Sequence, residues 1–174
     1  MKDKIKFYLD REHIIRDKNV VVLARKYLEK AQKNLLTTQI LSEINRNSKV
    51  REILKIPKDY DSNEWVVITG YYAMYSSALA LLAKIGFRSK SHTATLIILD
   101  ELFVKKKLMD SELLLTLKNA FIKKEELEKL SDARHKREIA QYSITKDTTR
   151  DIAEKIKKDA YEFVNKVELI LMQM

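Results

Sequence analysis

The fold of this chain is decided by residues 65–86, WVVITGYYAMYSSALALLAKIG. Apolar side chains recur in this stretch at helical spacing, and Gly86 follows them, as glycine does at the C-terminus of a helix. Just upstream, Asp61 and Glu64 have the spacing of a capping box, which indicates where the helix begins. One side is expected to carry Trp65, Ile68, Tyr72, Tyr75, Ser76, Leu79 and Leu82. The stretch therefore predicts a long helix that faces a core.

Similar patterns near both ends of the chain predict further helices. Upstream, a helix is expected over residues 20–45, followed by a short helical piece over 50–55 and a loop at Pro57, the single proline. The stripe of this first helix consists of Val20, Ala24, Tyr27, Leu28, Ala31 and Leu35. Near the other end, Thr148 and Asp151 form a second capping box, which predicts the start of a last amphipathic helix.

Two more helices are expected between the central stretch and the last helix. One is expected to begin at Ser89 or Ser91, and the next to run from Asp110 to about residue 141. Helices with a single apolar face must bury that face against one another. The sequence therefore predicts an all-α fold, an antiparallel bundle of about five helices.

Composition excludes several classes of function. The chain has 174 residues and a formal net charge of +9, with 34 Lys and Arg against 25 Asp and Glu. Two glycines and one proline are too few for an all-β fold or a glycine-rich phosphate loop. With no cysteine and three scattered histidines, we expect no disulfide, metal or cofactor. No signal peptide or apolar run long enough for a membrane span is recognised, so one cytoplasmic domain over residues 1–174 is expected.

The densest polar cluster is DARHKREIAQY, residues 132–142. Arg134, Arg137 and Gln141 share one helical face, and His135 and Tyr142 share another. Such a run is often a solvated helix face, but guanidinium groups are also the side chains best matched to phosphate oxygens. Because Arg137 and Tyr142 lie about 140° apart on a regular helix, they converge only if the helix ends between them or a second subunit contributes.

Three motifs in this order resemble the HEPN family (higher eukaryotes and prokaryotes nucleotide-binding). The first is Tyr-Tyr-Ala-Met at residues 71–74, the second is Ser91 followed by His92, and the third is Arg-x-x-Ala-x-Tyr from Arg137 to Tyr142. The resemblance is to small stand-alone prokaryotic members. It covers roughly residues 20–172, with an insertion at about 45–61 where relatives have a tighter turn.

The resemblance implies an antiparallel helical bundle that dimerises, with the third motif near the subunit interface. Many members pair with a minimal nucleotidyltransferase in a two-component, toxin–antitoxin type system. Catalytic members are metal-independent RNases in which an Arg steadies the phosphate and a later His moves protons. Here Tyr142 stands at the histidine position, and a phenol with a pKa of about 10 is a poorer base at neutral pH than imidazole at about 6.5. Ile144 stands where some toxin-type members carry a tyrosine that accepts nucleotide, so that regulation is not expected.

Three functional hypotheses follow. The first is a homodimeric binding module that recognises a nucleotide, RNA or a nucleotidyltransferase through Arg134, Arg137, Gln141 and Tyr142. The alternative is a metal-independent, toxin-type RNase that uses Arg137 with Tyr142 or His135. The third is a scaffold whose basic face docks an acidic protein.

Other residues have two interpretations each. Tyr71, Tyr72 and Tyr75 have the spacing of base-stacking side chains, but aromatics at helical spacing more often belong to a core. His92, beside the serine that caps a helix, is interpreted as structural rather than as a ligand contact. The lysines at 105–107 are either a solvated helix end or part of a positive surface.

Overall fold

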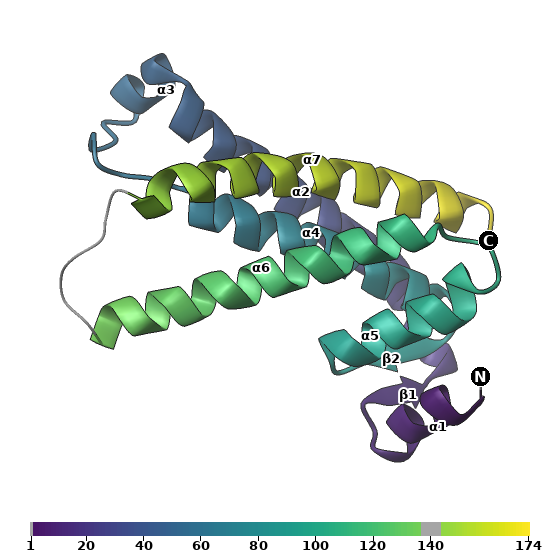
Figure 1. Cartoon of the computed structure of the whole chain (residues 1–174). Helices are drawn as coiled ribbons and strands as arrows, with labels where there is room; N and C mark the ends of the chain where they lie inside the picture. The colour runs from purple at the N-terminus through teal and green to yellow at the C-terminus, as the bar shows by residue number, and fades with distance from the viewer. Residues whose placement is uncertain (1, 137–143) are drawn as a thin grey trace.

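The computed structural model describes the backbone of residues 2–136 and 144–174 and the side chains of residues 5–129 and 150–174. Within those ranges the chain forms seven α-helices and two short strands, so the all-α prediction is confirmed (Figure 1). The helices are α1 (Lys2–Asp10), α2 (Ala24–Arg46), α3 (Ser48–Ile53), α4 (Asn63–Lys84), α5 (His92–Leu99), α6 (Ser111–Lys136) and α7 (Ile144–Met172). The short pieces are the 3₁₀ helix η1 (Lys18–Leu23), the π-helical turn η2 (Asp100–Val104), and the strands β1 (Ile14–Arg16) and β2 (Phe87–Ser89).

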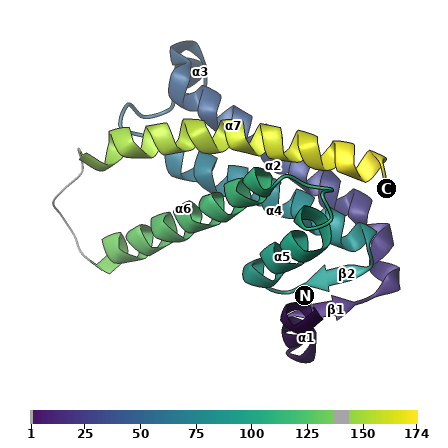
Figure 2. The same ribbon diagram turned by 45° about the vertical axis from the view of Figure 1, so that its right-hand side comes forward.

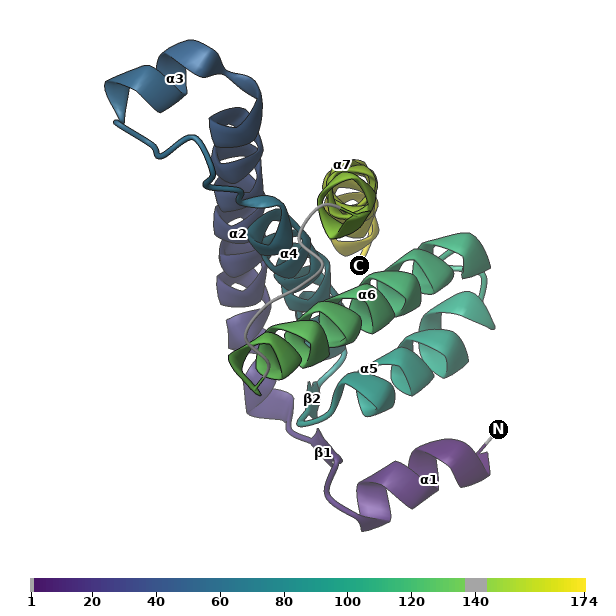
Figure 3. The same ribbon diagram turned by 60° about the vertical axis from the view of Figure 1, so that its left-hand side comes forward.

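Helix α4 is the centre of the bundle. It packs against α2, α6 and α7, which surround it when the molecule is viewed as in Figure 3. Its small side chains let its neighbours approach closely: a Cβ added at Gly70 would lie 2.9 Å from Cγ2 of Ile156 in α7. The apolar side chains buried along α4 are Val66, Val67, Tyr71, Ala73, Met74, Ala78, Ala80, Leu81, Leu82 and Ala83.

This central position corrects the predicted apolar side of α4. Ser76 and Leu82 are buried as expected, but Ile68, Tyr72, Tyr75 and Leu79 are only half-buried. Trp65, at the start of the expected stripe, is 56% exposed. A helix enclosed by several neighbours has no single buried face, so the one-sided pattern assumed for it was wrong.

The predicted stripe of the first long helix and the predicted amphipathic character of the last one are confirmed. In α2, Ala31 and Leu35 are buried, and the Thr38 hydroxyl lies 2.8 Å from the Thr69 hydroxyl of α4. In α7, the buried side chains are Ala153, Ile156, Ala160, Phe163, Val164 and Val167. Residues 18–23, however, form a 3₁₀ helix rather than the first turns of the α-helix.

A two-stranded sheet, which the sequence did not predict, ties the N-terminal region to the bundle. Strands β1 and β2 are antiparallel, with Ile14 opposite Ser89 and Arg16 opposite Phe87. Ile14 is buried in the core. Figure 2 shows α1 and this sheet together, at the opposite end of the molecule from α3.

The expected helix ends were correct in two cases. Gly86 has φ of +76°, the conformation that lets glycine end a helix, and its N–H donates to the carbonyl of Ala83. Ser91 caps α5, because its Oγ accepts a hydrogen bond from the backbone N–H of Ala94 at 3.3 Å. The short helical piece in the insertion is present as α3.

Both predicted capping boxes were wrong. The N-cap of α4 is Ser62, and the carboxylate of Asp61 accepts from the backbone N–H of Asn63, two residues on, at 2.7 Å. Helix α7 begins at Ile144, so Thr148 lies inside the helix rather than at its start. Capping boxes are short patterns that recur inside helices, which explains the second error.

By length and composition, α4 is apolar enough to cross a membrane, so the expectation that no apolar run reaches that length was wrong. In this structure 72% of its most apolar window is buried among the other elements. Such burial is typical of the core helix of a globular protein.

Replacing Gly70 with alanine should lower the free energy of unfolding. The added methyl group would overlap Cγ2 of Ile156, and overpacking of this kind costs about 1–3 kcal/mol. Alanine's better helix propensity acts in the opposite direction by about 1 kcal/mol. We expect urea denaturation to show net destabilisation in the wild-type background. In an Ile156→Ala background, which lacks the overlapping methyl group, Gly70→Ala should instead stabilise. Stabilisation in both backgrounds would show that the two helices are not in close contact.

Candidate functional site

Only part of the predicted anion site falls on a described element, the C-terminal end of α6. Arg134 and His135 belong to the last turn of α6, but their side chains lie outside the described residues. Arg137, Gln141 and Tyr142 lie outside the described residues altogether. Their convergence on one site therefore stays a prediction. The C-terminus of α6 lies at the same end of the molecule as α3 and the start of α7 (Figure 1).

Two of the three motifs meet inside the bundle. Tyr71, on the central helix α4, and His92, the first residue of α5, are joined by a hydrogen bond between the Tyr71 hydroxyl and Nδ1 of His92. Ser91 positions His92 by capping α5 at the preceding residue. The contact fixes the start of α5 against the middle of α4.

Aromatic rings enclose this hydrogen bond. The His92 ring stacks on Phe121 of α6, with centroids 5.0 Å apart, and lies 4.2 Å from the ring of Tyr75. Tyr71 is buried, and the rings of Tyr71 and Tyr75 are stacked at 5.8 Å. The small gap among these rings has no room for a water molecule. The structure therefore supports the interpretation of these tyrosines and of His92 as core residues rather than as base-stacking or ligand-binding side chains.

Charged groups on α6 lie beside the aromatic cluster. Lys124 is only 6% exposed, and its Nζ lies 2.6 Å from Glu128 Oε2 and 3.2 Å from Glu125 Oε1. The same ammonium group lies 5.9 Å from the ring centroid of Tyr72. The sequence reasoning missed Lys124. A signal was available, because Lys124 follows Leu117 and Phe121 at helical spacing and so lies on the buried face of α6.

Both partners of the Tyr71–His92 hydrogen bond are held in their neutral forms. Burial, with smaller contributions from Tyr75 and Tyr72, raises the pKa of the Tyr71 phenol well above its usual value. Burial, followed by the charge of Lys124, lowers the pKa of His92. The Tyr71 hydroxyl therefore donates and Nδ1 of His92 accepts, which places the imidazole proton on Nε2. The Tyr71–His92 hydrogen bond therefore connects α4 to α5, and neither of its two side chains is available as a general base.

Metal binding finds no support in the part of the chain whose side chains are described. No three His, Asp or Glu residues come together there as ligands. The polar groups in and beside the aromatic cluster are the phenols of three tyrosines, one imidazole and a lysine with two glutamates, which fit structural packing.

We expect His92 to make the fold less stable in mild acid. Its pKa is lowered in the folded protein, whereas the unfolded chain takes up a proton near pH 6.5. Stability is therefore fully present above about pH 6.5 and falls as the pH drops below it. His92→Asn keeps an oxygen acceptor for Tyr71 and removes the titration. Urea midpoints at pH 7.5 and 5.5 should fall less for the variant than for the wild type. Because Lys124, Glu125 and Glu128 are the same in both proteins, equal falls would contradict this account.

Comparisons with known proteins agree with this architecture. A family model described as the HEPN domain matches residues 58–170. A UPF0332 protein from Archaeoglobus fulgidus is 35% identical over 100 residues, which cover 58% of this chain and 69% of that protein. The matched region runs from the end of the insertion nearly to the end of α7 and includes all three motifs. The chain therefore belongs to the HEPN domain family.

Proposed function

We propose that the protein binds nucleotides or RNA through the C-terminal end of α6, as a non-catalytic member of the HEPN family. The observation that carries the proposal is the run of cationic side chains at residues 134–137, within the matched HEPN region. Guanidinium groups pair with phosphate oxygens in a fixed, bidentate geometry, so Arg134 and Arg137 are the chosen contacts. The net charge of +9 supports an encounter with a polyanion.

We further propose that the protein acts as a homodimer and as the partner of a minimal nucleotidyltransferase in a two-component system. Family membership supports this proposal. A small nucleotidyltransferase encoded by the neighbouring gene, together with co-purification of the two proteins, would support the pairing. Light scattering on the pure protein reports the dimer directly, and a monomer at all concentrations would contradict it.

The double variant Arg134→Ala/Arg137→Ala should lose affinity for RNA at least tenfold. We would measure the fluorescence anisotropy of a labelled 12-nucleotide single-stranded RNA between 50 and 300 mM salt. Each lost phosphate contact lowers the slope of log K against log salt by about 0.7, so the slope should fall by about 1.4.

Lys106→Ala/Lys107→Ala is the matched control for this experiment, because it removes the same charge at the opposite end of the bundle. Both lysines are exposed, and Lys106 lies near the C-terminal Met174. The control should keep wild-type affinity and slope. Equal losses in the two double variants would mean that binding is nonspecific, and an absence of salt-dependent binding by the wild type would overturn the proposal.

We expect the same RNA to stay intact in the presence of EDTA. Tyr142 replaces the imidazole that catalytic members use, and general acid–base catalysis contributes roughly 10²–10⁴-fold where it operates. Gel analysis should show equal background with the wild type and with Arg137→Ala. Cleavage by the wild type that disappears in Arg137→Ala would show the RNase alternative instead.

A further inference from the structure

A polar cleft of about 250 Å³ lies at the α3 end of the molecule. The end of α2, the segment after α3 and the first described turns of α7 form its walls, and its lining includes Arg46, Lys58, Tyr60, Arg150 and Glu154. One wall therefore comes from the insertion at residues 45–61, most of which precedes the region matched by the HEPN model. The cleft is separate from the aromatic cluster.

The insertion is held in place by polar contacts rather than by apolar packing. The Arg51 guanidinium group donates to the carbonyl oxygens of Pro57 at 2.6 Å, Tyr60 at 3.2 Å, and Lys58 and Ile44 at 3.4 Å. In contrast, Ile53 is 77% exposed, so apolar burial does little to fix this segment. These hydrogen bonds use the backbone of residues 57–60 and leave the side chains of Lys58 and Tyr60 at the cleft.

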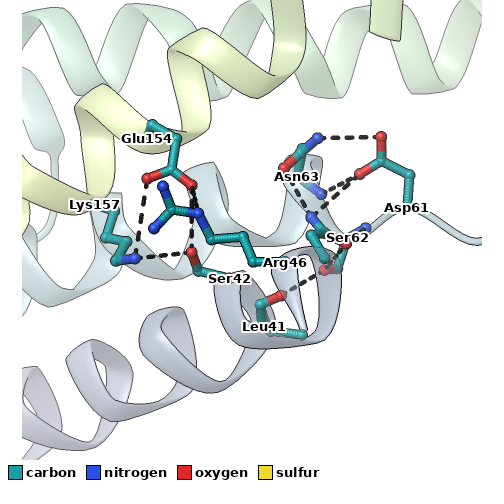
Figure 4. A network of polar contacts seen from close by, with 9 residues as sticks. Leu41, Ser42, Arg46, Asp61, Ser62, Asn63, Glu154 and Lys157 are labelled. Atoms are coloured by element: carbon teal, nitrogen blue, oxygen red, sulfur yellow. Dashed lines mark hydrogen bonds and ion pairs between the residues drawn. The ribbon is translucent and has the colours of Figure 1, made fainter. Parts of the chain in front are cut away.

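The junction between the insertion and α4 is fixed in a similar way (Figure 4). The amide of Asn45 donates to Asn63 Oδ1 at 2.7 Å, and the Ser62 hydroxyl lies 2.8 Å from the carbonyl oxygen of Leu41. The carboxylate of Asp61 accepts from both the backbone and the side-chain amide of Asn63. One carboxylate of the cleft is therefore engaged in holding its wall.

A second carboxylate, Glu154, is also engaged. Its Oε1 lies 3.2 Å from Nε of Arg46, and its Oε2 lies 3.9 Å from Nζ of Lys157 (Figure 4). Three carboxylates line the cleft, and of these only Asp59 neither holds the wall nor forms an ion pair with a described side chain. Lys58 and Arg150 have no ion-pair partner among the described side chains. The cleft therefore presents two free cations beside an aromatic ring, Tyr60, that is 41% exposed.

We propose that this cleft binds one nucleotide of a single-stranded RNA, with the phosphate between Lys58 and Arg150 and the base stacked on Tyr60. Cationic side chains next to an aromatic platform are the usual means of binding single strands, and in a duplex the faces of the bases are not available for stacking. Because the Arg51 and Asn45 contacts hold the backbone of this wall in place, little of the cost of ordering that backbone remains on binding. The proposal rests on the proposed function and extends it from the end of α6 to the insertion.

The test uses the labelled 12-nucleotide RNA and the full-length chain. Lys58→Ala/Arg150→Ala should weaken binding at least fivefold and lower the salt slope by about 1.4, because two phosphate contacts are lost. Tyr60→Ala should also weaken binding at least about fivefold with no change in slope, whereas Tyr60→Phe should keep wild-type affinity. None of these three side chains takes part in the hydrogen bonds that fix the wall, so thermal unfolding should match the wild type.

The matched control is Lys49→Ala/Lys55→Ala, which removes two exposed charges of the same insertion outside the cleft. Its salt slope should stay close to that of the wild type. If wild-type protein binds RNA and the cleft variants behave like this control, the cleft proposal is overturned and the proposed function stands. If the wild type shows no salt-dependent binding, the proposed function fails and the cleft proposal fails with it.

Discussion

The close packing of α4 against its neighbours is the constraint on which the rest of the structure depends. Gly70 brings α4 so near to α7 that even one methyl group would overlap Ile156. Small buried side chains such as Ala73 and Ala78 let the central helix be enclosed on several sides. Protein interiors are packed as densely as organic crystals, so the close contact of α4 with its neighbours also fixes the positions of those helices. Both the aromatic cluster and the junction beside the cleft include residues of this central helix, Tyr71 and Asn63.

The central helix connects two chemically different regions. In its middle, Tyr71 and His92 form a dry, neutral hydrogen bond among aromatic rings, which joins α4 to α5 and α6. At its N-terminal end, Asn63 and Ser62 hold the wall of an open, charged cleft. The end of α6, to which residues 134–136 of the basic cluster belong, lies on that same end of the molecule (Figure 1). Our account therefore places RNA contacts at this end and gives the aromatic cluster a structural role.

The sequence predicted the helices from α2 to α7, because their apolar patterns, the stop at Gly86 and the start at Ser91 are local signals. It did not predict α1 (Lys2–Asp10). It did not predict the strands, since three-residue pairs such as Ile14 with Ser89 depend on contacts between distant segments. The basic cluster at residues 134–137 was visible in the sequence. The cleft was not, because it joins Arg46, Tyr60 and Arg150 from three separate segments, and the contacts of Arg51 that order it are to backbone carbonyls.

The most direct test of this account is to crosslink wild-type protein to single-stranded RNA containing 4-thiouridine and to identify the attached peptides by mass spectrometry. The account predicts crosslinks to the peptide containing Tyr60 and to peptides from residues 130–150. Crosslinks concentrated at residues 105–107 or on the strands at the opposite end of the bundle would contradict it.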